Sequence, residues 1–233
     1  MKAYFKYLNF LIYFVVIIFQ LVPPSSLATT KETYRPPSGK VRRQVRKAGG
    51  SRGCNLPLND TVTLLVPQDH TATTVSERPI FFWYLSQQLS SSLRFTLLEP
   101  GKKPIFIKEL APEPGIVALK IPQNSPPLEV GKTYRWTVTI VCNPRKPSKN
   151  LFAQAWIERV PLPRSNTSFE NVHNTSLCNV EYAQAGIWYD ALACNYAKLI
   201  ENEDRLDLPQ FWSLLEEIDL PNLARQKPKL SLY

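Results

Sequence analysis

The sequence predicts an α+β protein in which an antiparallel β-sandwich of immunoglobulin or fibronectin type precedes a small helical domain. Short β-branched and aromatic runs recur between prolines and glycines up to Val160. One of these runs alternates between apolar and polar residues, and helical periodicity replaces both patterns after Pro163. We expect the sandwich over residues 54–164 and the helical domain, a hairpin with one or two short helices, over residues 165–233.

The first 28 residues have the order of a secretory signal peptide. Lys2 and Lys6 precede an apolar run from Leu8 to Val22, and Ser26-Leu27-Ala28 places small residues where a signal peptidase cleaves. The run is shorter than the roughly 20 residues that a membrane-spanning helix needs. We therefore expect cleavage after Ala28, with an uncleaved anchor as the alternative. The mature protein is predicted to be periplasmic or secreted, without a transmembrane segment.

Residues 29–53 are predicted to form a flexible basic arm, because they contain too few apolar side chains to repay the entropy of ordering. The arm contributes much of the net charge of +9 and contains a run of cations without an acid. The cations expected to contact a partner are Arg42, Arg43, Arg46 and Lys47. The partner would be an anionic envelope polymer or an envelope protein. A solvated linker is the alternative, and nucleic acid is excluded because no aromatic residues are interleaved with the cations.

The candidate strands of the sandwich lie between proline and glycine turns. They are Val62–Val66, Pro79–Leu85, Leu93–Glu99, Pro104–Leu110, Ile116–Ile121, Thr133–Cys142 and Leu151–Val160. In Thr133–Cys142 the apolar side chains alternate with Arg135, Thr137 and Thr139, so the polar set is expected to face solvent. The segment Leu128–Tyr134 resembles a tyrosine corner, in which the phenol hydroxyl bonds to the backbone a few residues upstream.

Two helices are predicted from Phe169 to Ala185 and from Ile187 to Glu201, with Gly186 ending the first. Two more are expected to start at Asp207-Leu208-Pro209 and Asp219-Leu220-Pro221, where an acid precedes a proline. The aromatic residues after Pro209 are expected in the core.

The chain has four cysteines, which suggest two disulfides in an oxidising compartment. Cys178 and Cys194 flank Gly186 at equal distances, so an antiparallel hairpin would place them level with each other. We therefore favour the pairs Cys178–Cys194 and Cys54–Cys142 over the other two connectivities. A zinc site is not expected, because no C-x-x-C pair is present.

No catalytic, phosphate-binding or metal-binding motif occurs, so neither a catalytic residue nor a cofactor is predicted. The clearest recognition candidate is Trp188, Tyr189 and Asp190, because exposed aromatic side chains give a large contact area at low entropic cost. The alternative is a packed hairpin in which Asp190 accepts a hydrogen bond from a backbone group.

Several motifs together resemble a cyanobacterial family of exported proteins that is classed as a domain of unknown function. These motifs are Pro79-Ile80-Phe81-Phe82-Trp83-Tyr84, Leu128–Trp136, and Gly186-Ile187-Trp188-Tyr189-Asp190-Ala191-Leu192. The resemblance covers nearly all of the chain after Gly49. It implies a cyanobacterial source and an envelope location, and it implies no activity. It also implies that Cys54 and Cys142 recur in the family, whereas Cys178 and Cys194 are particular to this chain.

Together these features predict an exported, non-catalytic binding or scaffolding protein of the cell envelope. The alternative is an envelope hydrolase with a cleft between sandwich and helices, for which paired carboxylates with shifted pKa values would be diagnostic. Assembly through an unprotected edge strand is a third possibility.

Overall fold

The computed structural model describes residues 34–39, 42–49, 61–111, 113–163, 178–201, 209–226 and 229–233. The predicted signal peptide and the first residues of the predicted arm lie outside these ranges, as does Cys54. Nothing in the structure therefore bears on the expected cleavage after Ala28.

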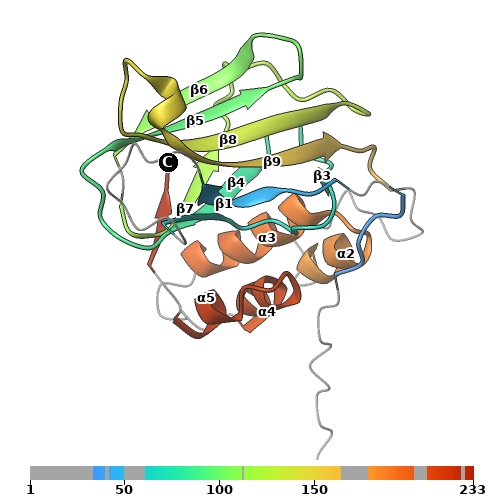
Figure 1. Ribbon diagram of the computed structural model, residues 1–233. Helices are drawn as coiled ribbons and strands as arrows, with labels where there is room; N and C mark the ends of the chain where they lie inside the picture. The colour runs from blue at the N-terminus through green and yellow to red at the C-terminus, as the bar shows by residue number, and fades with distance from the viewer. Residues whose placement is uncertain are drawn as a thin grey trace, which may run out of the picture. The chain divides into compact units, whose positions relative to one another are not determined.

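The described strands form one ten-stranded sheet with the order β10-β7-β4-β2-β1-β9-β8-β5-β6, and β3 pairs with β9 (Figure 1). All pairings are antiparallel except β10 with β7 and β3 with β9. The strands are β1 (Val45–Gly49), β2 (Val62–Leu64), β3 (Ala72–Thr74), β4 (Ile80–Leu85), β5 (Ser92–Leu98), β6 (Pro104–Leu110), β7 (Gly115–Lys120), β8 (Thr133–Val141), β9 (Leu151–Arg159) and β10 (Leu230–Leu232). A 3-10 helix, η1 (Pro147–Lys149), lies between β8 and β9.

The sheet curls so that its two halves face each other across an aromatic layer. β1 joins the halves, because it pairs with β2 on one side and with β9 on the other. The ring centroid of Phe81 in β4 lies 5.0 Å from that of Phe95 in β5 and 5.1 Å from that of Trp136 in β8. All three side chains are fully buried, and tilted rings at this separation attract one another beyond their shared apolar area.

The predicted order of strands followed by helices is confirmed up to α5, and the fold is α+β; β10, which follows the helices, was not predicted. The predicted strands correspond to β2 and to β4 through β9, each with its ends within two residues. β8 alternates as expected: Tyr134, Trp136, Val138 and Ile140 are buried, and the residues between them are partly exposed. What the structure establishes is a single curled sheet that continues through β1.

The tyrosine corner predicted from Leu128–Tyr134 is confirmed. The backbone N–H of Glu129 donates a hydrogen bond of 2.8 Å to the hydroxyl of Tyr134, five residues further on. The Tyr134 ring is buried at the start of β8. This bond fixes the crossover into β8 and thus the position of the strand that follows it.

The helices gather on one side of the sheet, beneath β1 and β3 in Figure 1. They are α2 (Cys178–Gln184), α3 (Trp188–Glu201), α4 (Pro209–Glu217) and α5 (Pro221–Gln226). Gly186 ends the α2 turn with a φ of +75°, as its position predicts, and an added Cβ would lie 2.7 Å from the carbonyl oxygen of Arg35. The predicted hairpin is confirmed, although the first helix is described only from Cys178.

Hydrogen bonds from buried side chains join the hairpin to the sheet. The indole N–H of Trp188 donates to the carbonyl oxygen of Leu65 at 2.9 Å. The indole N–H of Trp136 donates to the hydroxyl of Tyr189 at 2.8 Å. Helices and sheet share one hydrophobic core, and the C-terminal residues return to the sheet as β10.

The predicted flexible arm is wrong for the residues that form β1. Val45–Gly49 is a strand in the middle of the sheet, and Gln44 and Arg46 are buried. The prediction failed because it counted only apolar side chains. The inward side chains of this segment are polar, and hydrogen bonds to neighbouring backbone groups replace the missing apolar contacts.

Cys142 and Cys194 are both disulfide-bonded. The sulfur atoms bonded to them lie outside the described side chains, so the pairs Cys54–Cys142 and Cys178–Cys194 stay a prediction.

Among the described strands, the path through the sheet ends at β10 and β6, and β3 pairs with β9 off this path. β10 is three residues long, and β6 carries the exposed charges of Lys108 and Glu109 near its end. Short strands and charged side chains disfavour edge-to-edge pairing. The structure therefore gives little support to assembly through an edge.

We expect Gly115→Ala to lower the free energy of unfolding by about 2–4 kcal/mol. The alanine would have to adopt a strained φ, and its Cβ would collide with backbone atoms. Gly115 has a φ of +121°, and its Cβ would lie 2.3 Å from the carbonyl oxygen of Lys229, which accepts a hydrogen bond from the N–H of Ile116. The change should displace β10. Urea unfolding measures the effect.

Gly101→Ala is the matched control, because Gly101 has a φ of +80° but nothing within 4 Å of the added Cβ. This variant carries only the conformational cost of about 1–2 kcal/mol. A truncation that removes residues 229–233 should abolish the difference between the two variants. Equal losses in the full chain would contradict the close approach of β10.

Candidate functional site

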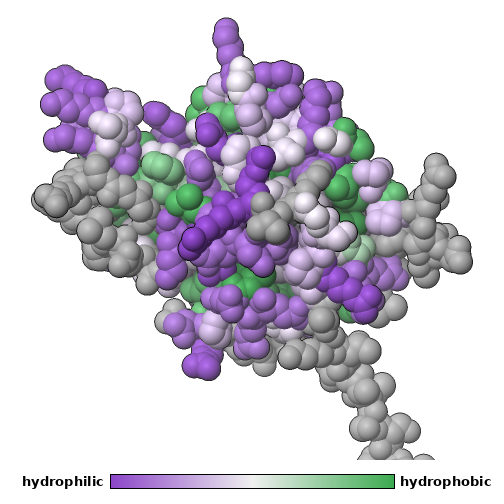
Figure 2. Space-filling view, turned by 45° about the vertical axis from the view of Figure 1, so that its right-hand side comes forward, coloured by the Kyte–Doolittle hydropathy of each residue, from purple (hydrophilic) through white to green (hydrophobic). Residues whose placement is uncertain are grey.

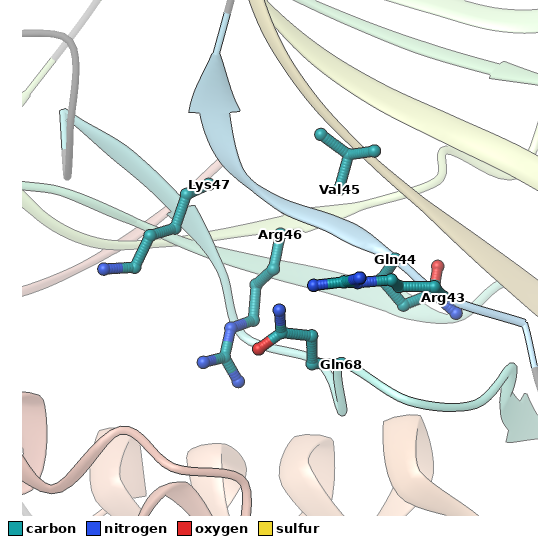
Figure 3. Close-up of a pocket in the computed structure, with 6 residues that line it drawn as sticks. All are labelled: Arg43, Gln44, Val45, Arg46, Lys47 and Gln68. Atoms are coloured by element: carbon teal, nitrogen blue, oxygen red, sulfur yellow. The ribbon is translucent and has the colours of Figure 1, made fainter.

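Two adjoining open pockets lie where β1 faces the turn between α4 and α5. The first, the β1 pocket, has a volume of about 440 Å³ and is lined by Arg43, Gln44, Val45, Arg46, Lys47 and Gln68 (Figure 3). The second, the turn pocket, has a volume of about 490 Å³. Its lining consists of Tyr34, Pro36, Arg43, the loop Pro67–His70, and Glu217–Asp219. Arg43 and Gln68 line both pockets, so the two form a continuous depression.

The alternation of β1 decides which side chains line the β1 pocket. Arg43, Val45 and Lys47 are exposed, whereas Gln44 and Arg46 are buried, as period two requires of a strand. Figure 3 shows Val45 and Arg46 pointing to opposite sides of the strand. The strand therefore presents two exposed cations along its outer side and holds a third cation beneath it.

Gln44 fixes the strand to its neighbours through both ends of its amide. Its Nε2 donates to the carbonyl oxygen of His70 at 2.6 Å, and its Oε1 accepts from the backbone N–H of Trp156 at 2.7 Å. Its own backbone N–H donates to the carbonyl oxygen of Gln68 at 2.9 Å. Two of these bonds hold Gln44 of the β1 pocket against Gln68 and His70, which line the turn pocket.

Arg46 is a buried cation, and only 6% of it is exposed. Its Nη1 donates to the carbonyl oxygen of Ile218 at the end of α4, and its Nε has no partner in the described structure. Burial lowers the pKa of Arg46, and the nearby carboxylate of Asp219 offsets part of this shift. An arginine stays charged nonetheless, so a fixed positive charge lies at the base of the β1 pocket.

Asp219 owes its position to the end of α4. Its φ is +61°, and it is the residue after the last turn, where the left-handed conformation closes a helix. The N–H of Leu220 donates to the carbonyl oxygen of Leu215 at 2.9 Å, which completes the cap. The carboxylate of Asp219 is thereby placed in the lining of the turn pocket.

A chain of hydrogen bonds crosses the turn pocket from Tyr34 to Asp69. The hydroxyl of Tyr34 lies 2.8 Å from Nε2 of His70, and Nδ1 of His70 lies 2.7 Å from Oδ1 of Asp69. Because a carboxylate only accepts, Nδ1 donates to it, and in the neutral ring Nε2 accepts from Tyr34. His70 is buried and stacks on the Tyr34 ring with centroids 5.6 Å apart.

The pKa shifts in this chain disfavour acid–base catalysis. Burial raises the pKa of Tyr34, and the negative charge of Asp69 raises it further, so the phenol stays protonated. Partial burial raises the pKa of Asp69, but hydrogen bonds from His70 and from its own backbone outweigh this effect and lower it overall. A general acid for sugar hydrolysis needs a raised carboxyl pKa instead.

Among the described residues, no group of three His, Cys, Asp or Glu side chains could hold a metal ion. The same residues contain no helix that is both long and apolar enough to span a membrane.

The model of one family, described as Domain of Unknown Function (DUF928), matches residues 47–228. The chain belongs to this family. No curated protein and no solved structure matches the chain. The match begins within β1 and ends before β10, so it includes nearly the whole sheet and all four helices. Lys47 lies inside the matched DUF928 region, whereas Arg43 and Arg46 precede it.

The structure of the DUF928 protein places the two groups of predicted contact residues differently: three of the basic residues line a pocket, and the aromatic group is buried. Arg43, Arg46 and Lys47 come together at the β1 pocket. Arg42 lies over the indole of Trp156, with its guanidinium carbon 4.2 Å from the ring centroid. The basic residues predicted to make contacts thus lie in one region. They belong to β1 and to the residues just before it, and not to a flexible arm.

The second predicted group, Trp188, Tyr189 and Asp190, cannot form a recognition patch. Trp188 is fully buried and Tyr189 is 1% exposed, because the first turn of α3 packs against β3 and β8. Asp190 accepts hydrogen bonds from the Thr74 hydroxyl at 2.7 Å and from the backbone N–H of Val75 at 3.1 Å. The alternative interpretation, a packed hairpin with Asp190 bonded to backbone, is the correct one.

Sequence reasoning missed the residues that complete the pockets, namely Tyr34, Gln68, Asp69 and His70. Their contributions depend on contacts between segments far apart in the chain, such as the bond between Tyr34 and His70. The sequence did contain one signal. Tyr34 is the only aromatic residue in residues 29–53, and an aromatic residue is unexpected in a segment that does not pack against a hydrophobic core.

Proposed function

We propose that this DUF928 protein is an exported, non-catalytic binding protein that holds an anionic polymer of the cell envelope in the β1 pocket. One observation carries the proposal: among the described residues that line this pocket, three are cations, Arg43, Arg46 and Lys47, and none is an acid. An open pocket with a fixed charge at its base favours a ligand of opposite charge over a neutral one.

The arrangement of the cations suits a polymer more than a single small anion. Arg43 precedes β1 and Lys47 lies within it; both are exposed, and four residues of extended chain correspond to about 13 Å. Two charged groups at this separation are contacted by successive anionic units of a chain. Each exposed contact is weak, so affinity depends on several acting together.

Polar side chains dominate the face shown in Figure 2, and hydrophobic residues appear on it only in separate patches. This surface favours a hydrated polymer over a lipid tail. The envelope is the compartment to which the predicted signal peptide would deliver the protein, and the motifs shared with cyanobacterial proteins support a source of that kind.

The proposal also includes the kind of sheet that carries the pocket. The tyrosine corner and the aromatic layer between β4 and β8 support an immunoglobulin-like origin of the curled sheet. Sheets of this kind commonly bind ligands on a rigid face or at one end, and we propose that β1 forms such a binding surface.

We expect the double variant Arg43→Ala/Lys47→Ala to bind an immobilised anionic polysaccharide about tenfold more weakly at low salt, because two charge contacts are lost. Its affinity should also depend less steeply on salt concentration. Binding isotherms at several salt concentrations measure both effects. The matched control, Lys103→Ala/Lys120→Ala, removes the same charge from exposed positions on β7 and the β5–β6 turn. If the control loses as much affinity, the β1 pocket is not the site.

One observation favours the hydrolase alternative: the turn pocket contains the carboxylates of Asp69, Glu217 and Asp219. The lowered pKa of Asp69 argues against its acting as a general acid. Incubation of the mature protein with anionic polysaccharides, followed by a reducing-end assay, decides the matter. Release of reducing ends that Asp69→Asn abolishes would establish the enzyme, and no release would exclude it for those polymers.

A further inference from the structure

The solvent face of β5, β8 and β9 is an array of side chains that the β1 pocket does not use. The registers of these strands place residues side by side in three rows. We call this array the outer grid; its rows are Leu98, Arg135 and Trp156, then Thr96, Thr137 and Gln154, then Arg94, Thr139 and Phe152. The residues between these positions point into the core, so the grid is the whole outer surface of this part of the sheet.

The outer grid combines aromatic rings, short polar groups and guanidinium groups without a carboxylate of its own. Phe152 is 40% exposed at one end and Trp156 is partly exposed at the other, separated by about 13 Å along β9. Hydroxyl and amide groups of Thr137, Thr139 and Gln154 lie between them. Arg94 is paired with Glu109 of β6, with Nε 2.5 Å from Oε1.

Two arginines flank Trp156. The guanidinium carbon of Arg42 lies 4.2 Å from the ring centroid and that of Arg135 lies 6.0 Å from it. A ring in this position orients the guanidinium plane and reduces the entropy that the arginine loses on binding. The Nε of Arg135 is buried and has no partner in the described structure. The Trp156 end of the grid therefore holds two guanidinium charges beside the ring, and these charges attract an anionic group.

These features favour a saccharide over other anionic polymers. A peptide that binds as an added strand would need a free strand edge, and the strands of the grid lie inside the sheet. A lipid surface would need a continuous apolar patch, and here the middle row is polar. Sugar rings instead place C–H groups against aromatic rings and hydroxyls against short polar side chains.

We propose that the outer grid binds an acidic polysaccharide whose chain continues over Val45 into the β1 pocket. Val45 is the cross-strand neighbour of Gln154 and also lines that pocket, so it connects the two surfaces. The proposal rests on the proposed function and names the class of its ligand. The grid measures about 13 Å by about 10 Å, which exceeds a single sugar ring. Binding therefore increases with the number of linked units.

The test compares three soluble probes by isothermal titration with the mature protein: polygalacturonate, its methyl ester and polyglutamate. Polygalacturonate offers sugar rings and charge, the ester offers rings alone, and polyglutamate offers charge alone. We expect polygalacturonate to bind most tightly. Trp156→Ala should weaken its binding about three- to tenfold while changing the affinity for polyglutamate less than twofold.

Two further variants keep the result interpretable if Trp156→Ala lowers stability. Phe152→Ala removes an exposed ring and should reproduce the selective loss. Arg42→Lys keeps the charge but lacks the planar group that stacks on Trp156, so it too should weaken polygalacturonate more than polyglutamate. Lys103→Ala should leave the ratio of the two affinities unchanged.

The outcomes separate this inference from the proposed function. If both polymers bind equally, or the grid variants weaken both equally, the grid has no role in sugar recognition, and binding at the β1 pocket stands. If neither polymer binds the unaltered protein, both proposals fail. A selective loss of polygalacturonate binding in the ring variants establishes the grid.

Discussion

Replacing Asp190 by alanine is expected to lower the free energy of unfolding by about 2–4 kcal/mol, because it takes the acceptor from one buried and one partly buried donor. Asp190 is 7% exposed, in the first turn of α3. Its Oδ2 accepts from the Thr74 hydroxyl and from the N–H of Val75, immediately after β3. The carboxylate also lies near the positive end of the α3 dipole. The contact thus joins the helical hairpin to the sheet.

Urea and thermal unfolding at neutral pH measure this loss. For a chain of this size, a change of about 3 kcal/mol lowers the melting temperature by about 6–12 °C. Asp190→Asn should lose less, because its amide oxygen has two lone pairs and can take the place of Oδ2 as acceptor of both bonds, so that only the negative charge is lost. Thr74→Val tests the coupling directly: in the Asp190→Ala background it should cost less than in the unaltered protein. A fully additive double variant would show that the two side chains do not stabilise each other.

Strands and helices with strong patterns could be predicted from the sequence because their own residues determine them. Alternation in Thr133–Cys142 and the turn before Tyr134 identified β8 and its tyrosine corner without reference to the rest of the chain. Gly186 identified the hairpin turn, since a residue with positive φ ends a helix whatever packs against it. Local chemistry was sufficient for these elements.

β1, β3 and β10 could not be predicted in the same way. β3 and β10 are three residues long and pair in parallel with distant strands, so their stability comes from their partners. β1 is basic and carries polar side chains toward the interior. A rule that counts apolar residues rejects such a strand. β1 forms because the side chains of Gln44 and Arg46 find carbonyl acceptors on neighbouring segments.

The same contrast applies to the candidate site. The cations between Arg42 and Lys47 could be found because charge is visible in the sequence, although their fixed arrangement could not. The motif Trp188-Tyr189-Asp190 was misjudged because aromatic and acidic residues serve a buried junction as well as an exposed patch. The two roles differ only in what packs against them. Trp156 became a candidate only once the register placed it beside Arg135 and Arg42.

The protein is expected to lose stability between about pH 10 and about pH 12, as its buried tyrosines ionise. Burial raises the pKa of Tyr182 to about 12, and the negative charges of Asp190 and Glu181 add to the shift. Burial also raises the pKa of Tyr34 and of Tyr189. In the unfolded chain these phenols ionise near pH 10, as ordinary tyrosines do. Between the two pKa values the folded state therefore binds more protons than the unfolded state.

The sign of the effect follows from this difference. A raised pKa in the folded state gives stability that is fully present below about pH 10 and is lost as the pH rises through about 12. Within this window each such tyrosine lowers the free energy of unfolding by about 1.4 kcal/mol per pH unit. Tyr34 and Tyr189 act together with Tyr182, so the loss is steep. Tyr34 lines the turn pocket, and that pocket should open in the same transition.

Urea unfolding at neutral pH, near pH 10 and near pH 12, together with the near-ultraviolet absorbance of tyrosinate, measures the effect. Tyr182→Phe keeps the ring and removes the ionisable hydroxyl, so its stability should fall less steeply with pH. Tyr84→Phe, at a partly exposed position, is the matched control for the removal of a tyrosine hydroxyl. If tyrosinate forms near pH 10 while the protein stays folded, these phenols are accessible to solvent. In that case the packing of Tyr34 and Tyr182 against the core is less complete than their burial indicates.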